Sequence, residues 1–213
     1  MRLYYFTTRT HGLLALKNRR LKISRINELN DPFEFMAWNT RDAGLRARLR
    51  EWKNQRNEEY GIVCFSSKWR SPVLWSHYAD KHAGIAIGFE VPDGDVYNRV
   101  RYRRTRLPVP RRELVGSDVD EVLLTKFSAW RYESEYRCLC RLHDSLAEGD
   151  LFFEQFSYAL ELAQVIVGER CQISRAELSI ALGQEYSHVE RFKVRSAFGS
   201  FSVVRNRDQK LWK

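Results

Sequence analysis

Short runs of alternating or wholly apolar residues recur along this chain, and such runs are typical of β-strands. The run at 61–67 is apolar until it ends in two hydroxyl residues, whereas the run at 2–8 mixes apolar, aromatic and hydroxyl side chains. Strands are predicted at residues 2–8, 20–24, 61–67, 84–91, 96–103, 132–140, 160–168 and 198–205.

Helical spacing of apolar residues marks the segments between these runs. The clearest case is the polar stretch 42–59, where Leu45, Leu49 and Trp52 are spaced for one helix face. An Asp-Pro pair indicates a turn within 27–34, because the residue before proline is disfavoured in the α region. Strands and helices do not alternate regularly, so we expect an α+β fold with mostly antiparallel or mixed sheets. Helices are predicted at residues 11–19, 42–59, 73–79, 117–126, 151–156 and 174–185.

The length of 213 residues suits one large domain, residues 1–213, with a basic tail over about 205–213. No apolar stretch approaches the ~20 residues of a membrane span, and the first residues lack the features of a signal peptide. We therefore expect a cytoplasmic protein without membrane contact. The four cysteines have neither disulfide nor zinc spacing, so we expect buried, reduced thiols.

Basic residues outnumber acidic residues by 36 to 27, which gives a formal net charge of +9. The excess is concentrated in a block over 99–112, which contains a tyrosine, and in the tail. Basic segments that carry aromatic residues can follow a phosphate backbone and stack on bases, so we predict nucleic-acid contact. The alternative is a charged strand edge and a disordered tail. The predicted contacts are Arg101, Arg103, Arg104, Arg106, Arg111 and Arg112.

Two glutamates stand two residues apart in the aromatic, β-favouring run 132–140. Because side chains alternate across a strand, Glu133 and Glu135 should project from one face, together with Arg137 and Arg131. Unpaired buried charge is costly, so this face either meets water or builds a site.

Several motifs of common enzyme classes are absent from the sequence. It has no phosphate loop, no G-x-G-x-x-G, no G-x-S-x-G and no H-E-x-x-H. His77 and His82 are five residues apart across a predicted helix end, which does not place them on one face for a metal. Hydride transfer, phosphate-loop chemistry and zinc hydrolysis therefore lose support, and no metal site is predicted.

Four further segments could contribute to a site. The turn 30–34 would cap backbone groups or form a pocket rim, and the hydroxyls that end 64–67 could orient a carboxylate. Aromatic side chains of 74–79 would pack in the core or wall a planar ligand. The opening strand places Tyr5, Thr7 and Arg9 on one face.

Read in order, these segments resemble a widespread bacterial family of uncharacterised domains. The resemblance covers residues 4 to about 140 and does not by itself name an activity. The shared motifs are NDPFE at 30–34, CFS at 64–66, LWSHYA at 74–79, GIAIGF at 84–89 and WRYESEYR at 130–137.

The order of features is also distantly similar to ADP-ribosyltransferases, which include the DarT-type toxins that modify DNA bases. Those enzymes have a first-strand residue that holds NAD, a strand ending in serine or threonine, and a late strand with Glu-x-Glu. The resemblance implies split, mostly antiparallel sheets with flanking helices, and NAD as a substrate. It implies that Glu135 is the catalytic carboxylate and that Glu133 orients or deprotonates the acceptor. The implied NAD-binding residues are Tyr5, Thr7, Arg9, Asn30, Asp31, Ser66, Trp75, His77 and Tyr78.

Together with the basic block, the resemblance predicts an NAD-dependent ADP-ribosyltransferase that modifies a base of RNA or DNA. Such a protein would act as a toxin or an anti-phage effector, with an antitoxin or inhibitory protein as a partner. Two alternatives stay open. A metal-dependent nuclease would hold a hard cation through Asp31 or Glu34 with Glu133, Glu135 and Lys126. A non-catalytic nucleic-acid-binding defence module would use Glu133 and Glu135 only to pair with Arg131 and Arg137.

Overall fold

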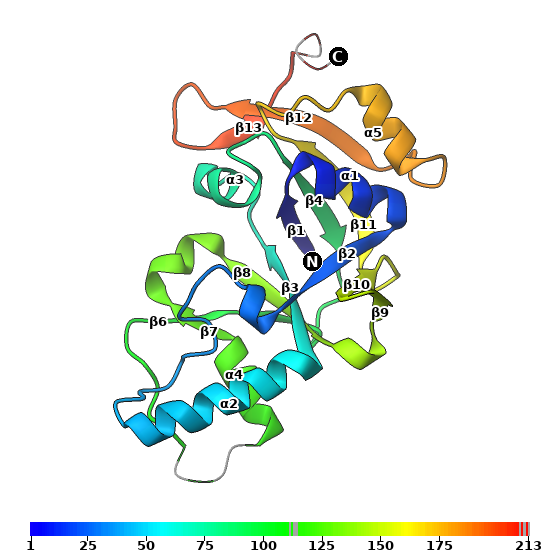
Figure 1. Cartoon of the computed structure of the whole chain (residues 1–213). Coiled ribbons are helices and arrows are strands. Elements are labelled where there is room, and N and C mark those ends of the chain that lie inside the picture. The colour runs from blue at the N-terminus through cyan, green and yellow to red at the C-terminus, as the bar shows by residue number, and fades with distance from the viewer. Residues whose placement is uncertain (111, 113–114, 209, 211, 213) are drawn as a thin grey trace. The chain divides into compact units, whose positions relative to one another are not determined.

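The computed structural model is a mixed α+β protein with a large, mostly antiparallel sheet and several helices (Figure 1). It describes residues 1–110, 112, 115–208, 210 and 212. The chain divides into two compact units. Unit 1 comprises Met1–Leu21, Phe65–Asp93 and Gln155–Lys213, and unit 2 comprises Lys22–Cys64 and Gly94–Glu154.

The sheet strands of unit 1 surround a central strand, β4 (Ile85–Glu90), whose side chains are almost entirely buried. Strand β4 lies antiparallel to β1 (Arg2–Thr7) on one side and to β11 (Glu161–Val167) on the other. Strand β12 (Glu190–Ser196) is parallel to β11 and antiparallel to β13 (Val203–Arg205). A strand buried on both faces is wholly apolar, which explains the run that predicted β4.

The described part of unit 1 contains the α-helices α1 (Arg9–Asn18), α3 (Pro72–Tyr78) and α5 (Arg175–Leu182). Ser174 caps α5 through a capping box with Glu177. Helix α3 buries Trp75 completely, and its indole Nε1–H donates to the Trp69 carbonyl at 2.6 Å. Trp75 therefore anchors the core that it forms with side chains of β1, β4, β11 and β12.

Unit 2 contains the long helix α2 (Ala43–Glu59) and the shorter α4 (Gly116–Leu123). Strand β8 (Glu135–Arg141) lies antiparallel to β5 (Tyr97–Arg99), and β6 (Arg101–Arg103) lies parallel to β7 (Thr125–Phe127). The remaining elements are β2 (Arg20–Arg25), β3 (Tyr60–Ser66), β9 (Leu146–Glu148), β10 (Leu151–Gln155) and the 3-10 helices η1 (Ile26–Glu28), η2 (Ser128–Glu133) and η3 (Leu142–Asp144).

The core of unit 2 holds an irregular segment, residues 33–38, against α2 and α4 (Figure 1). Trp52 of α2 lies between Phe35 and Trp38, with ring centroids 5.0 and 5.7 Å apart. Aromatic contacts of this kind add about 0.5–1.5 kcal/mol each beyond the burial of apolar area. They fix a segment that lies outside the helices and strands and whose backbone forms turn hydrogen bonds and an isolated bridge between Trp38 and Leu107.

Several predicted elements differ from the structure. The helix predicted at 151–156 is wrong, because this segment pairs with β9 as strand β10. The strand predicted at 96–103 is two short strands with different partners, and the helix predicted at 117–126 ends at Leu123. Strand β12 was not expected, and only the end of the strand predicted at 198–205 is extended, as β13.

The expectations for the cysteines and for the basic tail can also be compared with the structure. All four cysteines are free, and Cys138, Cys140 and Cys171 are buried while Cys64 is half-buried. In the basic tail, Trp212 is buried and its Nε1–H donates to the Ile173 carbonyl at 2.8 Å, which differs from the disordered tail of the alternative interpretation. Among the described residues, no helix is both long enough and apolar enough to cross a membrane.

Gly84 precedes β4 where two backbone segments of unit 1 come close together. A Cβ atom at this position would lie 2.1 Å from the Thr7 carbonyl oxygen and 2.9 Å from the Ala79 carbonyl carbon. We expect Gly84→Ala to lower the free energy of unfolding by more than about 2 kcal/mol, measured by chemical denaturation. Gly199→Ala is the matched control, because no atom lies within 4 Å of its Cβ position, and it should stay within about 0.5 kcal/mol of the wild type. Equal effects of the two substitutions would contradict this account.

Candidate functional site

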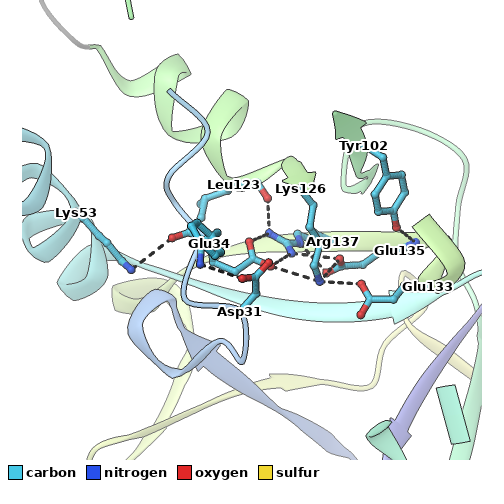
Figure 2. Close-up of polar contacts among 10 residues, drawn as sticks. Asp31, Glu34, Lys53, Tyr102, Leu123, Lys126, Glu133, Glu135 and Arg137 are labelled. Carbon is cyan, nitrogen blue, oxygen red and sulfur yellow. Dashed lines mark hydrogen bonds and ion pairs between the residues drawn. The ribbon is translucent and has the colours of Figure 1, made fainter. Parts of the chain in front are cut away.

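The guanidinium of Arg137 is the centre of a buried charge cluster in unit 2 (Figure 2). Arg137 lies on β8 and is completely buried. Its Nε donates to Glu135 Oε1 at 2.6 Å, and its two Nη atoms donate to the Glu34 carboxylate at 2.6 and 2.9 Å. Further bonds reach the Leu123 carbonyl at 2.5 Å and Glu135 Oε2 at 3.1 Å. All five N–H donors of the guanidinium are therefore used.

The second cation of the cluster is Lys126 on β7, which is also buried. Its Nζ lies 2.7 Å from Glu133 Oε2, 3.0 Å from Glu135 Oε2 and 3.4 Å from Glu34 Oε1. The ammonium also lies 5.0 Å from the centroid of the Trp130 ring, a cation–π distance. Three carboxylates thus surround one ammonium.

The two glutamates of the Glu-Ser-Glu sequence converge on Lys126, but they do not share a strand. Glu133 ends the 3-10 helix η2, Ser134 has a left-handed backbone with φ of 47°, and only Glu135 begins β8. The predicted strand face is therefore wrong, although its consequence, two neighbouring carboxylates, is correct. Arg131 is exposed, and its guanidinium lies over the Tyr102 ring, 5.9 Å from the centroid.

The third carboxylate comes from the Asn-Asp-Pro-Phe-Glu turn. Asp31 Oδ1 accepts the Phe33 N–H at 2.9 Å, and the Asp31 carbonyl accepts the Glu34 N–H at 2.9 Å. This is an Asx turn, in which the Asp31 side chain caps a backbone N–H, one of the two roles that the sequence left open for residues 30–34. Asn30 is exposed, whereas Asp31 and Glu34 are buried. The turn therefore delivers the Glu34 carboxylate to Arg137.

The acidic and basic side chains of the cluster stabilise one another, so they stay ionised although they are buried. Burial raises the pKa of the Glu135 carboxyl, but the charges of Arg137 and Lys126 outweigh burial and lower it from 4.5 to about 2. Burial lowers the pKa of Lys126, but the charges of Glu135 and Glu34 outweigh burial and raise it. Burial raises the pKa of Tyr102, whose hydroxyl accepts the Glu135 backbone N–H, to about 12.

A pocket of about 260 Å³, here called the arginine pocket, adjoins the cluster at Lys126. Phe33 and Phe127 are more than half exposed, and the Arg106 guanidinium lies over the Phe33 ring, 5.6 Å from the centroid. The pocket therefore combines aromatic surfaces with positive charge. Its lining includes Phe33, Met36, Arg103, Arg104, Arg106, Lys126 and Phe127.

A second pocket of about 210 Å³, here called the helix pocket, lies against α2. Lys53 lines it, and the Lys53 ammonium reaches the Glu34 carbonyl at 3.5 Å. Burial lowers the pKa of Lys53, and the charge of Glu34 opposes this effect. The lining includes Phe35, Met36, Trp38, Arg46, Arg50 and Lys53.

The predicted nucleic-acid contacts separate into three groups. Arg103, Arg104 and Arg106 line the arginine pocket together. Arg101 is exposed on β6, and Arg112 forms a bidentate pair with Asp118 at 2.8 Å. Arg111 lies outside the described residues.

The predicted NAD-binding residues fall in both units. Asn30 and Asp31 belong to unit 2, as do Glu133 and Glu135. The others belong to unit 1, and they are Tyr5, Thr7, Arg9, Ser66, Trp75, His77 and Tyr78.

Two of the unit 1 predictions need correction. Arg9 begins α1 instead of extending β1, and its Nη2 donates to Glu177 Oε1 at 2.6 Å. Trp75 has no exposed surface, so it packs in the core and is not open to stacking on a ligand. His77 is exposed beside the half-buried Tyr78, and Ser66 is buried with its Oγ accepting the Lys68 N–H at 3.0 Å.

No metal centre forms among the described residues, since no three His, Cys, Asp or Glu side chains are placed to hold an ion. The nuclease alternative put a cation among Glu34, Glu133 and Glu135, and the Lys126 ammonium lies there.

The residues that sequence reasoning missed are the aromatic and thioether walls of the pockets: Phe33, Phe127, Met36 and Trp38. Phe33 belongs to the turn 30–34, for which the sequence allowed a pocket rim, and Phe127 directly follows Lys126, but neither phenylalanine was singled out as a contact.

The low pKa of Glu135 predicts a specific dependence of stability on pH. A carboxyl whose pKa is lowered by folding stabilises the protein above its unfolded value and loses that contribution as pH falls towards the folded value. The change from 4.5 to about 2 corresponds to roughly 3 kcal/mol. We expect urea denaturation of the wild type to show this loss between pH 4.5 and 2, and Glu135→Gln to be less stable at neutral pH and to lack this part of the loss. Glu58→Gln, at an exposed ion pair with Arg25, is the control and should follow the wild type. Parallel curves for wild type and Glu135→Gln would contradict the prediction.

Comparisons with protein-family models, with curated proteins and with solved structures find no match to this chain. The family resemblance of the motifs and the similarity to ADP-ribosyltransferases therefore stay predictions. The coarser fold class, a mixed α+β protein with a mostly antiparallel sheet, agrees with the structure.

Proposed function

We propose that the protein binds single-stranded nucleic acid in the arginine pocket of unit 2. The observation that carries this proposal is the convergence of Arg103, Arg104 and Arg106 with the exposed rings of Phe33 and Phe127. Arginines neutralise phosphates, and exposed aromatic rings stack on bases at about 1–3 kcal/mol per base. One pocket thus offers both kinds of contact that a nucleotide needs.

The size of the pocket supports a polymer as the ligand. Sites that enclose a whole small molecule usually have volumes of about 300–1,000 Å³. The arginine pocket, at about 260 Å³, falls just below this range and suits one base or phosphate of a longer strand. The rest of such a strand would lie on the surrounding basic surface.

The charge cluster holds the arginine pocket in place, but the positive charge that is available to a ligand comes from other residues. Lys126 lines the pocket, but three carboxylates already surround its ammonium. The three arginines are exposed, so their charges remain available to a ligand. The cluster therefore acts as the rigid support that a binding site on irregular segments requires.

Fluorescence anisotropy with a labelled single-stranded oligonucleotide tests the binding proposal. We expect the triple variant Arg103→Ala/Arg104→Ala/Arg106→Ala to lose at least ~10-fold in affinity. Its plot of log affinity against log salt should be shallower by about 2, because each lost phosphate contact removes about 0.7 from the slope. We also expect Phe33→Ala/Phe127→Ala to lose at least ~10-fold.

Unit 1 offers a matched control for the aromatic variant. Phe198 and Phe201 are almost fully exposed, and Phe198→Ala/Phe201→Ala should bind as the wild type does. Wild-type affinity in both arginine-pocket variants, or no binding by the wild type to RNA or DNA, would overturn the proposal. Circular dichroism of each variant checks that it is folded.

A second candidate function is ADP-ribosyl transfer from NAD to a base of the bound strand. The observation that favours it is that Glu133 and Glu135 meet at Lys126, whose side chain also lines the arginine pocket. In this reaction the bond between C1′ of the ribose and nicotinamide breaks, and C1′ bonds to the base. The base loses a proton to a carboxylate, and nicotinamide leaves. Glu135 Oε1 accepts a hydrogen bond from Arg137, and Oε2 accepts one from Lys126. The Oε2 atom would therefore have to release Lys126 before it could bind the substrate. A protein with this activity would fit the role of a toxin or anti-phage effector held by an inhibitory partner.

Incubation with labelled NAD and separate pools of RNA, DNA and protein tests the transfer. We expect label in a nucleic-acid pool, release of nicotinamide, and loss of both in a folded Glu135→Gln variant. The Glu58→Gln variant is again the control. Absence of label from every pool would exclude the transfer and leave the binding proposal intact. Cleavage of the oligonucleotide that needs Mg²⁺ but not NAD would favour the nuclease instead.

A further inference from the structure

Helix α2 turns one basic edge towards the helix pocket. Arg46, Arg50 and Lys53 stand at positions i, i+4 and i+7 and line the same cavity. Residues with this spacing lie on one face of a helix. Among the residues that the structure describes, no acidic side chain belongs to the lining. The pocket therefore presents positive charge beside an aromatic wall, as the arginine pocket does.

These basic side chains differ in how far they are already engaged. Arg46 Nη1 donates to the carbonyls of Thr40 and Arg41 at 3.0 and 2.6 Å, so it holds the loop before α2. Arg50 is exposed, and Lys53 makes one long hydrogen bond of 3.5 Å to the Glu34 carbonyl. Arg50 and Lys53 are thus the cations most able to bind a phosphate.

The two pockets are neighbours. Met36 lines both of them, and its side chain is 39% exposed. Phe33 belongs to the arginine pocket and Phe35 to the helix pocket. Glu34 lies between these two residues in the chain, and the buried charge cluster fixes its carboxylate. One short, firmly held segment therefore separates two basic, aromatic cavities.

We propose that the helix pocket is a second nucleotide subsite, and that one single strand occupies both pockets and passes over Met36. This inference rests on the proposed function of the arginine pocket and adds the path and minimum length of the ligand. Each cavity is too small for more than a nucleotide fragment, at about 210 and 260 Å³. Bases of a duplex are stacked inside the helix, whereas those of a single strand are free to enter separate pockets.

Binding of oligonucleotides of increasing length to the variant Arg50→Ala/Lys53→Met tests the inference. In the wild type we expect affinity to rise steeply between a dinucleotide and a decanucleotide, because the second subsite binds a tethered group. The variant should bind the decanucleotide at least ~10-fold more weakly than the wild type. Its salt dependence should be shallower by about 1.4, which corresponds to two lost phosphate contacts.

The controls separate this inference from the proposal beneath it. Arg48→Ala removes a charge from the same helix outside the pocket lining and should bind the decanucleotide as the wild type does. Wild-type affinity and salt dependence in Arg50→Ala/Lys53→Met, while the triple arginine variant is weakened, would overturn the second subsite alone. Undiminished binding by both the triple arginine variant and Phe33→Ala/Phe127→Ala would overturn the arginine pocket, and with it this inference. Tighter binding of a duplex than of its separated strands would also overturn the path.

Discussion

Unit 2 depends on the hydrogen bonds of one buried guanidinium. Arg137 directs all five of its donors to Glu34, Glu135 and the Leu123 carbonyl. These groups come from a turn, a strand and the end of a helix, so one side chain joins three segments that are separate in sequence. Breaking a buried ion pair by removing one partner typically costs about 3–5 kcal/mol, because the other charge remains buried and uncompensated.

The same cluster explains how irregular segments can form defined pockets. Residues 33–38 and 104–106 lie outside the helices and strands, and loops of this kind are usually mobile. Here Glu34 and Lys126 are tied into the cluster, while Phe35 and Trp38 pack on Trp52. The exposed side chains between these anchors are left to form the walls of the two pockets. Packing in the core and exposure in a pocket are thus divided between neighbouring residues of one segment.

Local patterns in the sequence predicted the elements whose burial is periodic. The apolar runs of β3, β4 and β11, the helical spacing of α2 and the Asp-Pro turn all appear in the structure. Strand β12 was not predicted, but its pattern is visible in the sequence, since Phe192 and Val194 are buried and alternate with basic residues. Segment 151–155 had a signal too, because Gly149, with φ of 57°, and Asp150 form a two-residue turn between β9 and β10, and phenylalanine favours strands.

The candidate site was predictable only in part. The proximity of Glu133 and Glu135 followed from their spacing, but the left-handed Ser134 that produces it has no signal, since serine is not a residue that favours this conformation. The partnership of Glu34 with Arg137 depends on the fold and has no local signature. The exposed phenylalanines of the arginine pocket resembled core residues, because a sequence does not show which aromatic side chains remain uncovered.

The distance along the chain between Glu34 and Arg137 has a consequence for the newly made protein. These partners are 103 residues apart. At a synthesis rate of ~5–20 residues per second, the Glu34 carboxylate waits roughly 5–20 s before its guanidinium partner exists. During that interval the ion cluster cannot form. The segment around Phe33, Phe35 and Trp38 is therefore not yet fixed by Glu34 and can dock only loosely on α2. Residues synthesised early therefore acquire their fixed arrangement only when the strand that carries Arg137 has been added to unit 2.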